Sequence, residues 1–421
     1  MKKKNYYGII ILIIEICERT ALMEGYKLYS TVSDTDGLPP TKAVINRSAL
    51  VSNFTVLKEH IKGLSPKAEL IAVVKADAYG HSCELCAPSL AKAGCKRFAV
   101  SSAGEASALR GVLDEHGYDA DILVLGYTPP EHAPLLIKSR ITQCIFSLEY
   151  ANALSNALTD KIKVHIKLDT GMNRLGIRAE AFDEVKTATE EILRISKLEN
   201  LIIDGMFTHF PRSDEETHEA DAFTEKQFKL FEAVYSELLN CGIKINFRHV
   251  CNSAAAVRFP EYALDGVRVG IVMYGGGQSF CELPLKPVMS FETAVSHVHT
   301  LKKGEAVGYG GSFTANHDMK LITMPVGYAD GFIRDFKNCN VTLVTKSGAH
   351  KIPLVGRICM DQCMADATET DVERGDRVVL FGNSREELSE LAKLANTIDY
   401  EVLCLVSARV PRIDKDTFDV N

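Results

Sequence analysis

Short apolar runs rich in β-branched residues alternate with amphipathic stretches over the first two thirds of the chain. Eight runs are interpreted as strands: 69–75, 97–101, 121–126, 141–147, 161–169, 201–209, 244–252 and 266–274. Helical spacing of apolar residues occupies the intervals, for example 83–93, 103–116, 179–197 and 217–241. Strands that alternate with helices predict a parallel sheet, and eight is the number that closes a barrel. The near-continuous apolar runs suit strands that are buried on both faces.

The pattern changes at about residue 280, where helical periodicity is lost until about residue 386. Short alternating strands with glycine turns take over, at 293–301, 321–325, 340–345 and 377–380, and one late helix is expected at 386–395. The sequence therefore predicts an N-terminal (β/α)8 barrel at 41–280 and a mostly antiparallel C-terminal β domain at 281–421. A turn-rich segment, SDTDGLPP, separates the barrel from an N-terminal extension at 1–40.

The extension opens with MKKK and continues into an apolar run at 8–14 that Glu15 interrupts. This run is shorter than the roughly 20 residues that span a bilayer, and no small-x-small cleavage site follows it closely. A second methionine, Met23, is an alternative start. Three interpretations remain open: a dispensable extension, an export or membrane-surface segment, and a structural element. No later segment resembles a transmembrane helix, so no stable membrane partner is expected.

Composition narrows the function classes. A net charge of −7 over 421 residues forms no basic stripe, which argues against a nucleic-acid partner. The twelve cysteines are scattered, and a chain of this size needs no disulfide framework, so reduced thiols in a cytoplasmic protein are expected. Cys83 and Cys86 form a C-x-x-C without a second pair at metal-ligand spacing. They are interpreted as helical core residues, and no metal site is predicted.

Polar and charged residues gather where the predicted barrel strands end. The set comprises Lys75 and Tyr79; Lys167, Asp169 and Arg174; Thr208 and His209; Asn252 and Ser253; and Arg268, Gly270 and Ile271. The carboxyl ends of barrel strands carry the active site in this architecture. The list therefore predicts a reactive site at one mouth of the barrel.

Lys75 ends the apolar stretch IAVVKADAYG. Burial disfavours the ammonium form and lowers its pKa, so a neutral amine becomes available to form a Schiff base. The alternative is a lysine that extends from a strand end towards solvent. Ser253, Gly270 and Ile271 offer a hydroxyl and backbone N–H groups at the usual phosphate position of a barrel. A phosphate-bearing aldehyde on a lysine is pyridoxal phosphate.

Nine segments carry a family resemblance. They are VVKADAYGHS, KLDTGMNRLGI, MFTHF, CNSAAAVRFPEY, VRVGIVMYG, GYGGSFTA, VGYADGF, VGRICMDQ and YEVLCLVSARVPRI. Together, in this order over residues 41–412, they resemble the alanine racemase family of fold-type III pyridoxal-phosphate enzymes. The resemblance implies a pyridoxal 5'-phosphate barrel, a β domain, and a head-to-tail homodimer with shared active sites.

The same resemblance implies catalytic roles. Lys75 would hold the cofactor and act as one base, while Tyr309 of GYGG would act as the other base from the partner subunit. Arg268 would face the pyridine nitrogen and, because arginine stays protonated, would leave the ring a weaker electron sink. His209 would orient Arg268 or Tyr309. Viewed alone, Tyr309 would be interpreted as a turn tyrosine of the β domain.

Further residues are assigned in the same way. The cofactor-binding set is completed by Tyr79, Asn252, Ser253, Gly270, Ile271 and Tyr400. Arg174 and the backbone N–H of Met360 would hold the substrate carboxylate, and Lys167 matches a position that can be carbamylated to brace Arg174. Cys359 and Asp361 flank Met360 in ICMDQ and are expected to support it. Without the motif, Tyr400 would be placed in a C-terminal strand.

The expected activity is interconversion of L-alanine and D-alanine, which supplies D-alanine for peptidoglycan. Retention of the bulky Tyr400 favours a small pocket and hence alanine. The alternatives are a serine or broad-spectrum amino-acid racemase, a non-catalytic barrel that binds pyridoxal phosphate, and a decarboxylase of related architecture. The second domain with Tyr309 argues against the non-catalytic barrel, and Arg268 argues against the decarboxylase.

Overall fold

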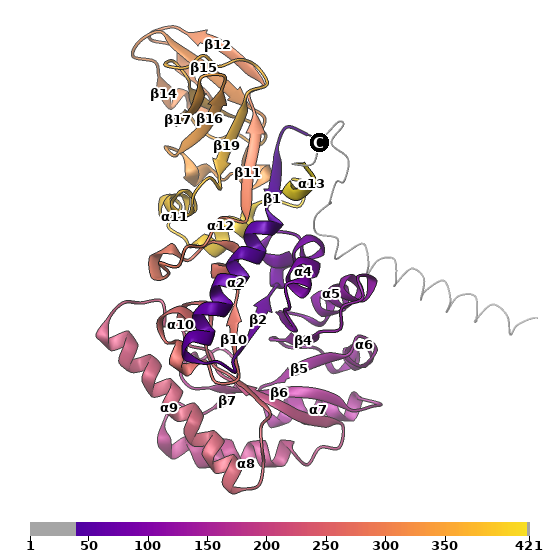
Figure 1. Cartoon of the computed structure of the whole chain (residues 1–421). Coiled ribbons are helices and arrows are strands. Elements are labelled where there is room, and N and C mark those ends of the chain that lie inside the picture. The colour runs from indigo at the N-terminus through magenta and orange to yellow at the C-terminus, as the bar shows by residue number, and fades with distance from the viewer. Residues whose placement is uncertain (1–38, 419–421) are drawn as a thin grey trace, which may run out of the picture.

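Eight parallel strands form a nearly closed barrel in the computed structural model, which describes residues 39–418 (Figure 1). In sheet order the strands are β10 (Gly266–Val269), β2 (Glu69–Val73), β3 (Arg97–Val100), β4 (Asp121–Val124), β5 (Ile141–Ile145), β6 (Ile162–Asp169), β8 (Leu201–Phe207) and β9 (Phe247–His249). A short strand, β7 (Ile177–Arg178), pairs beside β6. The predicted (β/α)8 barrel is confirmed. The extension predicted at 1–40 lies almost entirely outside the described residues.

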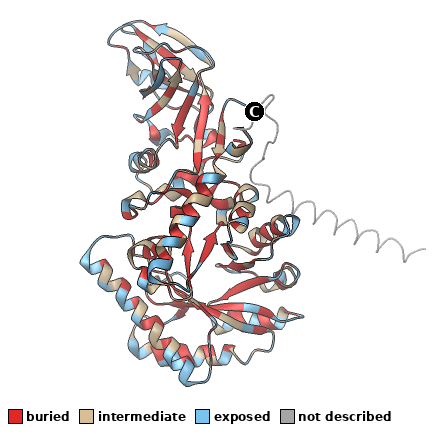
Figure 2. Cartoon of the chain, in the orientation of Figure 1, coloured by how far each residue is buried: buried red, intermediate tan, exposed pale blue. Residues whose placement is uncertain are grey.

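Isolated backbone hydrogen bonds connect the segments of β9 and β10 and close the barrel. The N–H of Asp265 donates to the Arg248 carbonyl, and the N–H of Arg268 donates to the Cys251 carbonyl, each at 3.0 Å. The strands themselves are almost wholly buried, as Figure 2 shows in red. This burial explains why their sequences lack the polar–apolar alternation of a half-exposed strand.

A ring of helices covers the barrel. After the strands come α4 (Cys83–Lys92), α5 (Ala103–Glu115), α6 (Ala133–Lys138), α7 (Leu148–Ala157), α8 (Val185–Ile195), α9 (His218–Asn240) and α10 (Ser253–Arg258). The earlier helix α2 (Arg47–Leu64) packs between α4 and α10 and completes the ring. In α8, Val185, Ala188, Ile192 and Ile195 form the buried stripe that the 3.6-residue period predicts. No helix in the described range 39–418 is long and apolar enough to cross a membrane.

The second lobe is a nine-stranded sheet. Its strands in order are β12 (His297–Leu301), β15 (Met319–Met324), β18 (Cys363–Asp366), β17 (Gly348–Val355), β16 (Asn340–Thr345), β19 (Arg377–Phe381), β11 (Met289–Ala294), β1 (Lys42–Ile45) and β20 (Arg412–Asp414). All neighbours are antiparallel except β1 and β20, so the predicted antiparallel β domain is confirmed. The short strands β13 (Ala306–Val307) and β14 (Phe313–Thr314) form a separate pair. Three helices come after β19: α11 (Arg385–Leu394), α12 (Asp399–Leu405) and, after β20, α13 (Lys415–Phe418).

Three details differ from the sequence-based expectations. The strand expected at 293–301 is two strands, because the chain leaves β19 after β11 and pairs with β15 in β12. Tyr400 lies in the helix α12 rather than in a strand, with Asp399 and Glu401 in the first turn, where the helix dipole favours acids. The strand β1, from the range assigned to the barrel, lies in the C-terminal sheet.

Candidate active site

The turn that carries Lys75 departs from ordinary backbone geometry. Lys75 follows β2, and residues 76–79 then have φ between +50° and +56° although none of them is glycine. A left-handed conformation costs an L-residue roughly 1–2 kcal/mol. Such strain persists only where surrounding contacts enforce it, and it concentrates at functional sites. This turn is therefore the first structural indication of a site at the barrel mouth.

Side chains of two distant residues and one neighbouring residue hold this turn. Glu105 Oε1 accepts a hydrogen bond from the first N–H of the turn, at Ala76, over 2.7 Å. His81 Nδ1 lies 2.9 Å from both final carbonyls, those of Ala78 and Tyr79. Arg412 Nε donates to the Gly80 carbonyl at 2.9 Å. The strained turn is thus fixed at its beginning and at its end.

The Lys75 amine has no hydrogen-bond acceptor among the described residues, and its side chain is partly buried. Burial lowers the pKa of Lys75, and the positive charge of Arg174 lowers it further. Glu105 and Cys404 act in the opposite direction. The balance increases the neutral fraction of this amine, as a Schiff-base lysine requires.

Arg268 lies in β10 with 4% of its surface exposed. One terminal nitrogen donates to the Nδ1 atom and the carbonyl oxygen of His249, at 2.8 and 2.7 Å. The other donates to the carbonyls of Thr208 and Val250, at 2.7 and 3.0 Å, and lies 3.5 Å from His209 Nδ1. Of the guanidinium N–H groups of Arg268, only the Nε–H has no acceptor among the described residues. Burial lowers the pKa of Arg268 to about 10, so the guanidinium remains charged near neutral pH.

These contacts determine the tautomers of a histidine chain. Since Arg268 can only donate, His249 Nδ1 must accept, and a neutral His249 carries its proton on Nε2. That proton points to His165 Nδ1 at 2.8 Å, so His165 is protonated on Nε2. Burial lowers the pKa of His249 well below its usual value and that of His165 to about 3, which is consistent with two neutral rings. The pair keeps Arg268 in a single orientation.

A second group of residues forms a cradle on the other side of the Lys75 turn. The Gly270 N–H donates to Ser253 Oγ at 2.9 Å, and a side chain at position 270 would overlap the Tyr79 hydroxyl. The Tyr79 and Tyr400 rings lie 6.0 Å apart. The buried Ile271 follows Gly270, and Asn252 Oδ1 accepts from the Ala255 N–H to cap α10. Only glycine fits at position 270, where the backbone must be approached closely.

Lys167 and Arg174 belong to the same mouth but not to one hydrogen-bonded pair. Lys167, at 5% exposure, donates to the Leu168 carbonyl at 2.6 Å and lies over the Phe207 ring. Burial lowers the pKa of Lys167 to about 8. Arg174 is exposed and has no acidic partner among the described residues. The mouth therefore contains cations that the described chain does not neutralise.

Four predicted residues lie in the other lobe. Tyr309 follows β13, and Cys359, Met360 and Asp361 follow β17, so these loops are separated from the barrel in one chain (Figure 1). Tyr309 is 72% exposed and Met360 is 54% exposed. Asp361 accepts from Arg409 at 2.8 Å. The structure does not bring these residues to Lys75 within one chain.

The loops that carry these residues nevertheless form one edge of the lobe. The backbone at Gly308 and Gly310 approaches Arg357, which immediately precedes the ICMDQ loop. The N–H groups of Tyr328 and Ala329 donate to the carbonyls of Cys359 and Met360, each at 3.0 Å. Tyr309, Tyr328 and Met360 are all among the exposed large apolar residues. This edge therefore presents several large apolar side chains to its surroundings.

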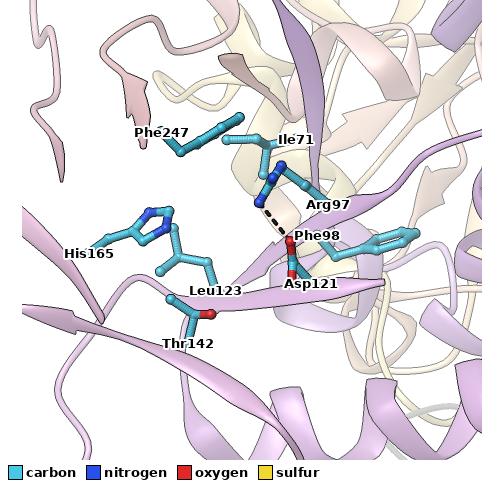
Figure 3. A pocket seen from close by; sticks show the side chains of 8 residues that line it. All are labelled: Ile71, Arg97, Phe98, Asp121, Leu123, Thr142, His165 and Phe247. Carbon is cyan, nitrogen blue, oxygen red and sulfur yellow. Dashed lines mark hydrogen bonds and ion pairs between the residues drawn. The ribbon is translucent and has the colours of Figure 1, made fainter. Parts of the chain in front are cut away.

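A separate hollow lies at the amino end of the barrel (Figure 3). Its lining residues are Ile71, Arg97, Phe98, Asp121, Leu123, Thr142, His165 and Phe247. Arg97 donates to Asp121 at 2.7 Å and to Glu69 at 2.8 Å, and its guanidinium lies 4.0 Å from the centre of the Phe247 ring. Its charges are mutually paired, and it lies at the barrel end associated with stability rather than catalysis.

Sequence reasoning missed several members of the site. Glu105, His249, His165 and Thr208 contact the residues described above, yet only Thr208 was noted, and without a role. The two histidines occur at buried positions of strands, and such polar residues in apolar runs are the signal that could have found them. Cys404 on α12, which acts to raise the pKa of Lys75, had been assigned only to the scattered thiols.

Comparison with known proteins places the fold in a family. Residues 45–278 match the family "Alanine racemase, N-terminal domain", and residues 288–414 match "Alanine racemase, C-terminal domain". Alanine racemase 1 of Clostridium acetobutylicum is 40% identical over 374 residues, covering 86% of this chain and 93% of the relative.

Two solved structures are informative. Alanine racemase of Clostridium difficile 630 in complex with cycloserine is 35% identical, with a TM-score of 0.78, 89% of this chain covered and 95% of the other. Histidine racemase of Leuconostoc mesenteroides is 28% identical, with a TM-score of 0.77, 91% of this chain covered and all of the other. The two neighbours are thus named for different amino-acid substrates.

Proposed function

The chain belongs to the alanine racemase family, and we propose that it interconverts L-alanine and D-alanine with pyridoxal phosphate, supplying D-alanine for peptidoglycan. The observation that carries this proposal is the occurrence, at one barrel mouth, of a lysine amine whose pKa is lowered by burial and an arginine with a single free donor. An aldehyde and a ring nitrogen are the chemical groups that such a pair fits.

The residues of the mouth fit the cofactor along its length. Lys75 would hold the aldehyde carbon, and the free Nε–H of Arg268 would donate to the ring nitrogen. Tyr79, Tyr400, Ser253 and the backbone at Gly270 and Ile271 would surround the phosphate, with Asn252 fixing the helix that presents Ser253. When bound, pyridoxal phosphate withdraws electrons from the substrate and so makes the hydrogen on the α-carbon more acidic.

Lys75 and Tyr309 would perform the proton transfers. Racemisation requires a proton to leave one face of the substrate α-carbon and another to arrive on the opposite face. Neutral Lys75 accepts the proton on one face, and the Tyr309 phenol delivers a proton on the other face. In the reverse direction the ammonium of Lys75 donates and the Tyr309 phenolate accepts.

The surrounding residues bind and orient. Arg174 and the Met360 N–H would hold the substrate carboxylate, since a guanidinium fork suits two oxygens. Carbamylation of Lys167, whose pKa of about 8 leaves a reactive neutral fraction, would supply an anion beside Arg174. His209, an acceptor towards Arg268 at Nδ1, keeps its Nε2–H available for Tyr309. Asp361 and Cys359 would fix the Met360 loop.

The exposure of Tyr309 supports a homodimer with shared sites. The tyrosine lies on the β lobe with 72% of its surface exposed, while Lys75 lies on the barrel. Each site would combine Lys75 of one subunit with the Tyr309 loop of the other.

The amine assignment can be tested by spectroscopy. Lys75→Ala should remove the absorbance near about 420 nm that a lysine-bound cofactor gives, together with racemase activity measured by optical rotation. Lys163→Ala, which alters an exposed lysine at the amino end of the barrel, is the matched control and should retain both. Unchanged absorbance in Lys75→Ala would refute the assignment.

Shared sites can be tested by complementation. Co-expression of Lys75→Ala with Tyr309→Phe chains places both defects in one site of each mixed dimer and leaves the other site intact. Random pairing would make half of the dimers mixed, so about a quarter of wild-type activity should return. A mixture as inactive as its parents would contradict the shared arrangement.

A broad-spectrum amino-acid racemase is the second candidate, favoured by the similarity to a histidine racemase. Tyr400 is the discriminating residue, because its ring stands next to Tyr79 and limits the space at the mouth. Relative turnover of L-alanine, L-serine and L-histidine by the purified protein decides between the two. Equal turnover of the three would support the broad-spectrum enzyme.

A further inference from the structure

We propose that Glu105 is a positioning residue that holds the left-handed turn after β2 and so aims the Lys75 amine. This inference rests on the function proposed above, because it concerns how the cofactor-binding lysine is presented. Glu105 itself would contact neither substrate nor cofactor. Its carboxylate joins two neighbouring strand ends at the barrel mouth.

The hydrogen bonds of Glu105 show this bridging. Oε1 accepts from the Ala76 N–H at 2.7 Å, directly after Lys75. Oε2 accepts from the N–H and the hydroxyl of Ser101, both at 2.7 Å, directly after β3. The adjoining backbone is also paired, since the Val74 N–H donates to the Ala99 carbonyl at 2.9 Å. One carboxylate thus fixes the end of β2 relative to the end of β3.

The local sequence makes this contact informative. Ser102 and Glu105 have the S-x-x-E spacing of a capping box, in which the glutamate turns back to its own helix. Half of that motif is present, because the Glu105 N–H donates to Ser102 Oγ at 3.3 Å. The carboxylate, however, reaches one residue further back to Ser101 and across to the Lys75 turn. Helix capping alone does not account for the bond to Ala76.

The position of the turn explains why its geometry matters. Lys75 lies at its beginning, while Tyr79, at its end, places its hydroxyl over Gly270 in the phosphate cradle. The turn therefore sets the spacing between the amine that takes the aldehyde and the cradle that takes the phosphate. His81 and Arg412 hold the far end, and Glu105 holds the end next to the amine.

Loss of the Glu105 charge and loss of its bridging contacts have opposite expected effects on cofactor attachment at Lys75, which makes the proposal testable. The negative charge of Glu105 raises the pKa of Lys75, so its removal alone would favour the neutral, reactive amine. Loss of the bridge would instead leave the amine misaligned. A neutral substitution that slows cofactor attachment therefore indicates positioning, whereas one that accelerates attachment indicates a charge effect.

The experiment measures the rate at which the full-length chain, freed of cofactor, takes up pyridoxal phosphate. The attached cofactor is trapped with borohydride, and the labelled fraction is counted by intact mass. We expect Glu105→Gln to slow attachment at least tenfold. Glu105→Asp keeps the charge but shortens the side chain by about 1.5 Å, and it should be slowed to a similar degree. Ser101→Ala removes one of the three bonds and should slow attachment less than threefold.

Glu149→Gln is the matched control, because Glu149 is an exposed acid in the first turn of α7 at the same barrel end. It should attach cofactor at the wild-type rate. The proposal is overturned if Glu105→Gln attaches as fast as wild type, with or without a lower Tm, or if Glu105→Asp alone keeps the wild-type rate. Failure of the wild-type chain to trap any cofactor would instead refute the proposed function, and the role of Glu105 with it.

Discussion

Positively charged side chains have different hydrogen-bond partners at the two ends of the barrel. At the amino end, Arg97 is paired with Glu69 and Asp121, and Lys163 lies within 4.0 Å of Asp121 and Asp204. At the carboxyl end, Arg268 and Lys167 are buried, yet they donate to backbone carbonyls and an imidazole rather than to carboxylates.

The difference separates stability from function. Charges that the chain neutralises itself need no external group, and partly exposed pairs of this kind contribute little to stability. Buried cations without an anionic partner are costly unless something else compensates them. The carboxyl end is therefore prepared for an anion that arrives from outside, such as a phosphate or a substrate carboxylate.

The largest expected effect comes from exchanging one arginine at each end. Arg268→Gln should reduce racemisation by about three orders of magnitude, near 4 kcal/mol, as loss of a preorganised donor does. Arg97→Gln, at the amino end, should leave kcat within twofold and affect only stability. Initial rates and Tm of both variants test this contrast. Arg268→Lys, which keeps the charge without the fork, should also be impaired; full activity in it would contradict the argument.

The next effect concerns an aspartate at each end. Burial raises the pKa of Asp77, in the strained turn, from 3.8 to about 6. The folded state then binds this proton more tightly than the unfolded state, so stability is lost as pH rises from about 4 to 6. The difference of about two units corresponds to at most about 3 kcal/mol. Asp77→Asn should therefore stabilise the protein at pH 8 and give no gain at pH 4.

Asp121→Asn is the counterpart at the amino end and should have the opposite sign. It removes an acid that pairs with Arg97 on the surface, at a cost below about 1 kcal/mol. Urea unfolding of both variants at pH 4 and pH 8 provides the comparison. If Asp121→Asn increased the free energy of unfolding at pH 8, as Asp77→Asn is expected to do, the predicted difference between the two barrel ends would be wrong.

The smallest expected effect is that of salt on the stability difference caused by Arg97→Gln. Raising ionic strength from about 0.05 M to 1 M shortens the screening length to about 3 Å. The stability difference between wild type and Arg97→Gln should then shrink by a few tenths of a kcal/mol. The activity difference caused by Arg268→Gln should stay the same, because that guanidinium is buried. An equal salt response at the two ends would count against the contrast.

The barrel was predictable because its strands are continuous apolar runs, and the predicted strands 97–101 and 161–169 begin within one residue of β3 and β6. The turn at 76–79 was not predictable. Its residues favour no left-handed conformation, and the groups that enforce it, Glu105 and Arg412, come from distant segments. Tyr400 was misplaced because VLCLV resembles a strand, whereas packing of α12 against α11 and against the Lys75 turn, α3 (Lys75–Tyr79), selects a helix.

The candidate site was predicted unevenly for the same reason. Lys75, Ser253 and Gly270 stand at strand ends, where the architecture itself points to chemistry. The partners that orient them, such as His249 acting on Arg268, are visible only once the strands are paired.

The strand β1 bears on how the chain reaches this structure during synthesis. Its neighbours are β11 and β20, so the earliest described strand stands between one strand that follows the whole barrel and another near the end of the chain. The barrel is an insertion within the C-terminal sheet. On the ribosome, β1 stays unpaired until the barrel residues have been synthesised, because both of its partner strands follow them. The sheet is complete only after residues 412–414 have been made. A nascent chain released before that point would contain a finished barrel beside an open sheet edge.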